Sequence, residues 1–416
     1  MVAAIGGRSA VPGAYWAWLG GTALSLVGVQ AMAFAMTWVA AGHGGRFAAV
    51  VLTAINLPRA LLLLVGGAVA DRVGAWRVMV VSDAVMVAVT VALAAAAWSS
   101  TDPRLPLLLA AVAIGVVDAF YLPSTGSMPR RLVPPDALAR AMSARQLAGQ
   151  LALLAGPSLG GLLLAGAGLA GAALTNAVTC LVMLSILLAL RSRAGRSAQP
   201  RAADRRARAA PEPPMDPAQS LWRACLDGVR VVSSHGALRP ALLLTGVAAG
   251  FLLPVSSLLV PLLARERVWS PQVTGAVVAA VALGTATAAV TVLARGALPR
   301  AGRAAATGLL VAAAGVAALA AGGSPKSAVA AGVAVGAGSG LFGTHIGPLI
   351  LAAAPVTHLA RVQSVLVLVQ SLPLLLTTSL LGSLAEAARV STVLHGCAGV
   401  LAVAGLVALT SPALRR

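Results

Sequence analysis

Twelve long apolar stretches decide what this chain can fold into. A helix needs about 20 mostly apolar residues to cross the hydrocarbon core of a bilayer. Stretches of this kind lie near 14–41, 47–70, 78–98, 105–128, 141–166, 169–190, 237–263, 272–294, 304–321, 327–353, 362–385 and 390–410. Only 10% of the residues are charged, whereas a soluble protein has about 25%. The sequence therefore predicts an all-α polytopic membrane protein with 12 transmembrane helices, the fifth and sixth separated only near Gly166.

The positive charges predict how the chain is oriented. If both termini are cytoplasmic, most arginines fall in the cytoplasmic segments. The other side holds only Arg46, Arg104, Arg265, Arg267, Lys326 and Arg389. Such asymmetry is typical of multi-pass proteins of the cell (inner) membrane. The net charge of +19 is therefore interpreted as a topology signal, and no nucleic-acid partner is predicted.

A polar, Arg- and Pro-rich segment divides the chain into two halves. We expect an N-terminal six-helix bundle over 1–190, a cytoplasmic basic linker over 191–236 and a C-terminal six-helix bundle over 237–416. Within the linker, residues 220–232 can form an amphipathic helix at the membrane surface. Two pseudo-symmetric bundles around a central site are the layout of many secondary transporters.

The turn between the second and third spans reads GGAVADRVGAWR (66–77) and resembles the inner-loop motif of the major facilitator superfamily. The matching residues are Gly67, Asp71, Arg72, Gly74 and Arg77. Ala75 and Trp76 stand where the family usually has basic residues, and the corresponding turn of the second half has Pro299 in place of the acid. The resemblance implies a gating role in which Asp71 latches the outward-facing state, and we group Asp83 with this network. The alternative is an ordinary charged turn.

The fifth span carries a second pattern, AGQLALLAGPSLGG (148–161). It is similar to the motif of the family's drug–proton antiporters at Ala152, Gly156, Pro157, Gly160 and Gly161. Small residues at this spacing form a flat helix face, and the proline bends the helix. The resemblance implies a closely packed interface between the halves that favours exchange. Plain helix packing is the alternative.

Residues 118–181 resemble the subgroup of siderophore (enterobactin-type) and macrolide exporters. Members of that subgroup often have an acid in the first helix, where this chain has Val29 and Gln30. The resemblance implies a twelve-helix exporter, and proton coupling must then depend on another acid.

Asp118, near the middle of the fourth span, is the candidate for that acid. An ionisable group inside the membrane is costly and is a functional hypothesis by default. Arg59 of the second span lies at nearly the same depth, within about 3 Å by helical rise. We expect Arg59 and Asp118 to form a buried proton-coupling pair. A static structural pair is the alternative.

Other polar and aromatic side chains at membrane depth are candidates for binding substrate. They are Gln30, Phe34, Asn56, Tyr121, Gln146, Gln150, His345 and Gln370. Each is also compatible with interhelical hydrogen bonding or packing. The sequence has no phosphate-binding Gly-Lys-Ser/Thr loop and no metal-ligand spacing. We therefore predict no enzyme activity, no cofactor and no metal site.

Together these features predict a monomeric exporter of small amphipathic or hydrophobic molecules, such as a drug, a siderophore or a secondary metabolite. Transport would be driven by proton antiport with alternating access. Two alternatives stay open: a proton-coupled uptake symporter of the same fold, and a non-transporting membrane sensor or scaffold.

Overall fold

The computed structural model describes residues 11–99, 102–197, 238–296, 298–353 and 359–411. All regular elements within these ranges are helical. The first half contains α1 (Gly13–Ala41), α2 (Gly45–Val73), α3 (Ala75–Ser99), α4 (Arg104–Leu132), the short 3-10 helix η1 (Pro135–Ala137) and α5 (Leu138–Ser197). The second half contains α8 (Leu238–Phe251), the π-helical turn η2 (Val255–Leu259), α9 (Val260–Glu266), α10 (Pro271–Arg295), α11 (Ala301–Ala321), α12 (Pro325–Ala353), α13 (Leu359–Ala387) and α14 (Val390–Thr410).

These helices supply the twelve predicted crossings. Eleven helices among the described residues are long and apolar enough to span a membrane, one of them the 52-residue stretch Arg140–Arg191 within α5. At 1.5 Å per residue that stretch is more than twice the ~30 Å thickness of the hydrocarbon core. It is broken at Gly168, whose φ of 63° and ψ of −162° are not helical and suit a residue without a side chain. The expected division between the fifth and sixth spans is therefore confirmed, two residues beyond Gly166.

One boundary differs from the prediction. α5 continues to Ser197, although the linker was expected from 191. Arginine and alanine are good helix formers, and the first proline of the expected linker is Pro200, so the helix can continue through the first residues of that linker. The rest of that linker, including the amphipathic helix expected over 220–232, lies outside the described residues.

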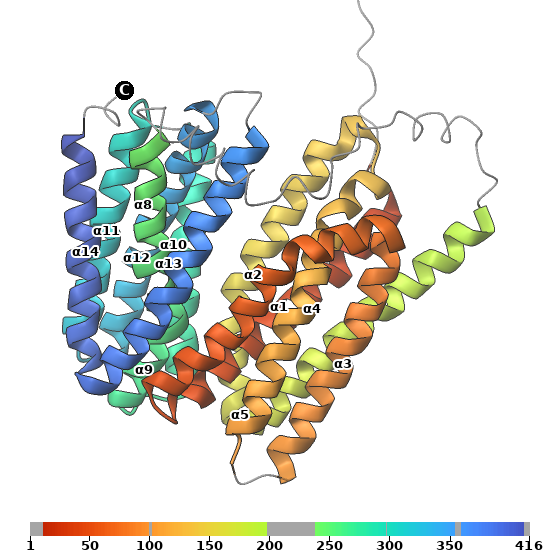
Figure 1. Ribbon diagram of the computed structural model, residues 1–416, viewed down its shortest axis with the longest axis horizontal. Coiled ribbons are helices and arrows are strands. Elements are labelled where there is room, and N and C mark those ends of the chain that lie inside the picture. The colour runs from red at the N-terminus through yellow and green to blue at the C-terminus, as the bar shows by residue number, and fades with distance from the viewer. Residues whose placement is uncertain (1–10, 100–101, 198–237, 297, 354–358, 412–416) are drawn as a thin grey trace, which may run out of the picture.

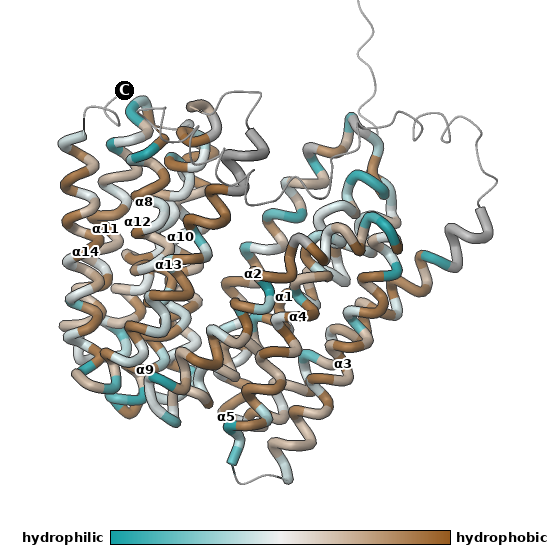
Figure 2. The backbone as a smooth tube through the Cα atoms, in the orientation of Figure 1, coloured by the Kyte–Doolittle hydropathy of each residue, from teal (hydrophilic) through white to brown (hydrophobic). Residues whose placement is uncertain are grey.

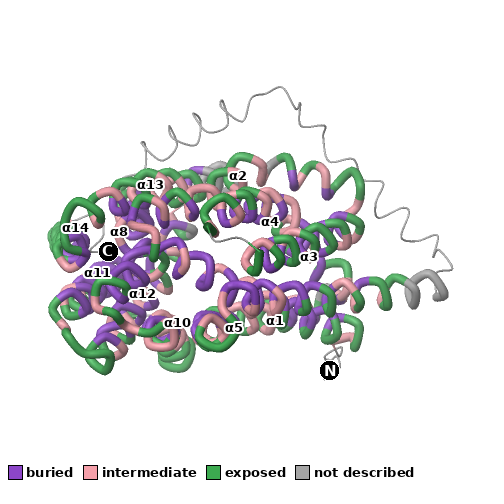
Figure 3. Tube along the Cα trace, turned by 90° about the horizontal axis from the view of Figure 1, so that it is seen from below, coloured by how far each residue is buried: buried purple, intermediate pink, exposed green. Residues whose placement is uncertain are grey.

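The helices form two groups, α1–α5 and α8–α14 (Figure 1). The groups lie against each other where α1 passes into α2 and α9 into α10, which we call the contact end. They diverge toward the opposite end, where α2 passes into α3, which we call the open end (Figure 1). Hydrophobic residues predominate along the helices (Figure 2), and many residues on the outside of both groups are exposed (Figure 3). Exposed leucines such as Leu293, with 86% relative exposure, require a lipid rather than a water environment.

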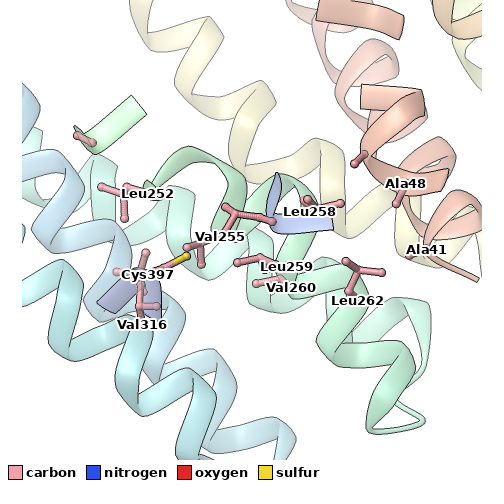
Figure 4. Close-up of a cluster of buried hydrophobic side chains, with 14 of the residues drawn as sticks. Ala41, Ala48, Leu252, Val255, Leu258, Leu259, Val260, Leu262, Val316 and Cys397 are labelled. Carbon is pink, nitrogen blue, oxygen red and sulfur yellow. The ribbon is translucent and has the colours of Figure 1, made fainter. Parts of the chain in front are cut away.

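A broken helix in the second group contributes to the core at the contact end. Pro254 cannot donate to the backbone carbonyl of Gly250, and α8 gives way to η2 at this point. The hydroxyl of Thr377 on α13 donates to that carbonyl at 2.6 Å, so the freed acceptor is satisfied within the membrane. Beyond the break, Leu258 and Leu262 lie toward Ala41 and Ala48 of the first group (Figure 4) in one buried hydrophobic cluster.

Candidate substrate cavity and coupling site

A cavity of about 560 Å³ lies between the two groups of helices. Its polar lining differs between the two sides. The first group contributes Gln30, Thr37, Asn56, Arg59 and Gln150. The second group contributes only hydroxyls: Ser256, Ser257, Thr285, Ser339 and Thr378. The remaining lining is apolar, and Arg59 is the one charged residue that lines the cavity among the described residues. This composition suits a small organic molecule with a few polar groups.

Arg59 and Asp118 form an ion pair at the cavity wall. The Arg59 Nη1 atom lies 3.5 Å from the Asp118 Oδ2 atom, and the side chains are 36% and 16% exposed. The other guanidinium nitrogen donates to the Asn56 side-chain oxygen, one turn earlier on the same face of α2. Asn56 in turn donates to the carbonyl of Leu52 at 2.8 Å. The pair expected from the depths of the two residues is therefore present, and only its arginine reaches the cavity lining.

Close packing of α2 on α4 brings this pair together. A side chain at Gly115 of α4 would clash with the backbone of Ile55, and one at Gly66 of α2 would clash with the backbone of Ala119. The two glycines therefore allow the helix backbones to touch on either side of the pair. Substitution of either would separate the helices that carry the two charges.

The structure divides the substrate-binding candidates. Gln30, Phe34, Asn56 and Gln150 line the cavity, whereas Gln146 and Gln370 are exposed outside it. Tyr121 packs against a buried cluster inside the first group.

His345 is 1% exposed and lies apart from the cavity lining. Its Nε2 atom accepts a hydrogen bond from the Leu298 backbone N–H at 3.1 Å. Its Nδ1 atom lies 2.9 Å from the Leu341 carbonyl and therefore carries the ring proton. The Nε2 atom thus joins α12 to the segment that follows α10, while the Nδ1 atom bonds within α12, which is a structural arrangement in this conformation.

The hydroxyl side of the cavity was not expected from the sequence. Ser and Thr are common in membrane helices, so single hydroxyls carry little signal. Ser256 and Ser257 lie in the π-helical turn between Pro254 and Pro261. Two prolines around a pair of serines inside an apolar span indicate a broken helix, and such breaks in transporters often mark the substrate site. That signal could have identified this wall of the cavity.

The inner-loop motif lies at the open end. Gly74 has φ of 98°, and its N–H donates to the Ala70 carbonyl at 3.0 Å, a conformation that favours glycine. Asp71, Arg72 and Arg77 are exposed, and Asp71 forms no ion pair with any described residue.

Asp83 does not join this turn. It lies eight residues, about 12 Å, along α3 from Ala75, and it is only 3% exposed. Asp83 therefore lies inside the first group of helices, and its role in gating stays a prediction.

The fifth-span pattern lies where three helices meet. Gly156 and Gly160 face α1 at Gln30 and Ala31. On the next face, Gly161 lies against the backbone of Pro271 in α10, and Gly275 of α10 lies against the backbone of Pro157. The pattern therefore forms part of the contact between the two groups, as the resemblance implies.

Polar contacts also join the two groups at the contact end. The Arg265 guanidinium lies 4.1 Å from the ring centroid of Trp38 and donates to the Trp38 carbonyl at 2.9 Å. Arg46 of α2 forms an exposed ion pair with Glu386 of α13 at 3.5 Å. The hydroxyls of Thr53 and Ser379 lie 3.4 Å apart across the same boundary.

Comparisons with known proteins agree with this architecture. The family model of the Major Facilitator Superfamily matches residues 18–378. A mutant of the peptide transporter POT in complex with alafosfalin is similar with a TM-score of 0.72 and 16% identity, over 97% of this chain and 95% of that chain. The nucleoside transporter NupG is similar with a TM-score of 0.71 and 13% identity, over 96% of this chain and 100% of that chain.

A POT family transporter in complex with a thioalcohol conjugated peptide gives a TM-score of 0.72 and 12% identity, with 96% of both chains covered. A search of curated proteins finds no match. At these identities the solved structures show the fold alone, whereas the family model spans most of the sequence. With its twelve crossings in two groups around a central cavity, the chain belongs to the major facilitator superfamily.

Proposed function

We propose that this protein is a secondary active transporter that exports small amphipathic or hydrophobic organic molecules in exchange for protons. The observation that carries this proposal is the Arg59–Asp118 pair in the wall of a mostly apolar cavity between the two bundles. The cavity volume of about 560 Å³ is in the range that holds small organic ligands.

The charge balance of the pair provides a reason for exchange. With Asp118 ionised, the pair is neutral overall, and the cavity tolerates an apolar or cationic solute. A proton on Asp118 leaves Arg59 with an uncompensated positive charge beside the solute. Burying such a charge against apolar or cationic groups is costly. Proton and solute therefore disfavour each other, which is the thermodynamic requirement for antiport.

The two ends of the molecule supply the alternating access. The bundles touch at the contact end and diverge at the open end (Figure 1). The arginine distribution supports a cytoplasmic open end, so this conformation is inward-facing. Export requires the contacts of Arg265, Arg46 and the Gly161 crossing to open. As the contact end opens, the bundles would close at the open end, and the exposed turn at Asp71 would then form its latch.

A substitution series in proteoliposomes tests this mechanism. Asp118→Asn carries a permanently uncompensated Arg59, and we expect it to abolish movement of cationic dyes driven by a pH gradient while the protein still inserts. Arg59→Gln combined with Asp118→Asn restores a neutral wall, so dye binding should recover without proton coupling. Gradient-driven transport by Asp118→Asn at the wild-type rate would remove Asp118 from the mechanism.

One observation favours a second candidate function. Arg59 reaches the cavity lining whereas Asp118 does not. A solute with an anionic group would pair with Arg59 and favour protonation of Asp118, so that solute and proton would be carried together as in an uptake symporter.

The sign of the proton movement separates the candidates. Release of protons from the purified protein on adding a cationic dye supports exchange, and uptake on adding an organic anion supports symport. A membrane sensor or scaffold would show neither.

A further inference from the structure

A second acid is buried in the first bundle with no partner among the residues that the structure describes. Asp83 is 3% exposed, and its Oδ2 atom has no hydrogen-bond partner among the described residues. None of the ion pairs that the described residues form involves Asp83. An isolated carboxylate in a membrane interior is very costly, and the cost falls when the group holds a proton.

Within the described part of the chain, Asp83 is surrounded by titratable groups and forms an ion pair with no cation. α3 packs against α2, α4 and α5. From α4 come Asp118 and Tyr121, and from α5 comes Cys180, all within electrostatic range of one another or of Asp83. Arg59 of α2 is paired with Asp118.

Tyr121 connects the two acids. It follows Asp118 by three residues and therefore lies on the same face of α4. Its buried hydroxyl makes no hydrogen bond of good geometry with the described residues, although the Ser25 side chain lies within range of it, and the hydroxyl is within electrostatic range of both Asp83 and Asp118. Measured along the helices from the open end, Asp118, Tyr121 and Asp83 lie at depths of about 21, 16 and 12 Å. The three groups therefore descend in order from the cavity toward the open end.

The direct route from Asp83 to the open end is closed by apolar side chains. Met79 lies one turn before Asp83 on α3 and is fully buried in a cluster with Tyr15, Trp18 and Met128. A proton on Asp83 would therefore exchange toward the Asp118 side.

We propose that Asp83 is a second proton-binding site, which exchanges its proton with Asp118 through the Tyr121 hydroxyl. In this step an Asp118 carboxylic acid gives its proton to the Tyr121 oxygen while the Tyr121 O–H proton passes to the Asp83 carboxylate. The phenol is unchanged, and one O–H bond has moved from Asp118 to Asp83. The present ion pair of Asp118 with Arg59 corresponds to the state in which Asp83 holds the proton. This inference rests on the proposed coupling role of Asp118.

Infrared spectroscopy of the purified protein in lipid tests this site without any substrate. At neutral pH ordinary surface carboxyls are ionised, so we expect a protonated-carboxyl band in the wild type that is lost in Asp83→Asn. Thr90→Val is the matched control, because Thr90 is a buried polar residue of α3 that bonds only to its own helix. A band that persists unchanged in Asp83→Asn would overturn the proposal.

Transfer of the protein into deuterated water tests the relay. A positioned proton-transfer group typically accelerates a step by about 100-fold or more. The rate at which the band shifts should therefore fall by about this factor in Tyr121→Phe relative to the wild type. A wild-type exchange rate in that variant would show that Tyr121 is not the relay. If Asp83→Asn fails to insert, Asp83→Glu, which should move the band without removing it, replaces it. These spectra are recorded on the resting protein and test only the role of Asp83. Gradient-driven transport is a separate measurement, and its failure would refute the proposed function.

Discussion

Alanine at Gly161 is expected to favour the outward-facing conformation. A Cβ atom at this position would lie 2.5 Å from the backbone oxygen of Pro271 in the other bundle, about 0.9 Å short of ordinary contact at 3.4 Å. The obstacle is backbone, so the bundles themselves must separate. Overpacking of this kind costs about 1–3 kcal/mol. Because the contact exists only while the contact end is closed, this free energy shifts the equilibrium between the two conformations by roughly 5- to 150-fold.

Disulfide formation between Thr53→Cys and Ser379→Cys measures this shift. The two native hydroxyls lie 3.4 Å apart at a different crossing, between α2 and α13, so they report the movement of whole bundles. The pair is introduced after Cys180, Cys225 and Cys397 are replaced, and we expect Gly161→Ala to slow cross-linking.

Gly149→Ala is the matched control, because Gly149 is on the same helix and a Cβ atom there would meet nothing within 4 Å. Equal cross-linking rates in the two alanine variants would refute the packing argument.

Three further predictions follow from the contacts. The Thr53→Cys/Ser379→Cys disulfide should hold the contact end closed and stop transport, with recovery on reduction; a cross-linked protein that still transports would contradict the assignment of this end as a gate. Arg265→Gln removes a cation–π contact worth about 0.5–2 kcal/mol and should likewise slow cross-linking of that pair, whereas Arg104→Gln, whose partner Asp102 is in the same loop, should not. His345→Leu leaves the Leu298 N–H without the partner it has now and should cost about 1–3 kcal/mol, lowering the thermal unfolding midpoint relative to Gln370→Ala with little change in solute affinity.

The fold was largely predictable because few backbone structures can span a lipid bilayer. In hydrocarbon every backbone group must be satisfied internally, so apolar length alone decides where helices lie. Even the break at Gly168 was expected to within two residues. The π-helical turn at Val255–Leu259 was not expected, because hydropathy does not register a change of hydrogen-bonding pattern inside an apolar span.

The charged residues of the candidate site could be predicted from the sequence, whereas its neutral polar residues could not. Arg59 and Asp118 could be paired from depth alone, because charges are rare in the membrane and must find each other. The burial of Asp83 inside the first group could not be predicted, because depth along a helix says nothing about the direction in which the side chain points. The sequence could not show which amide and hydroxyl side chains line the cavity. Their position depends on how each helix is rotated about its axis, and small residues set that rotation through packing.

The unequal walls of the cavity have a consequence for how such a protein can diversify. The Arg59–Asp118 pair belongs to α2 and α4, while the described residues of the opposite wall contribute hydroxyls and hydrocarbon. Under the proposed mechanism, substitutions at Ser256, Thr285 or Ser339 would reshape solute preference and leave the Arg59–Asp118 pair unchanged. New specificities would then arise in the second bundle, while the first bundle keeps the same coupling pair.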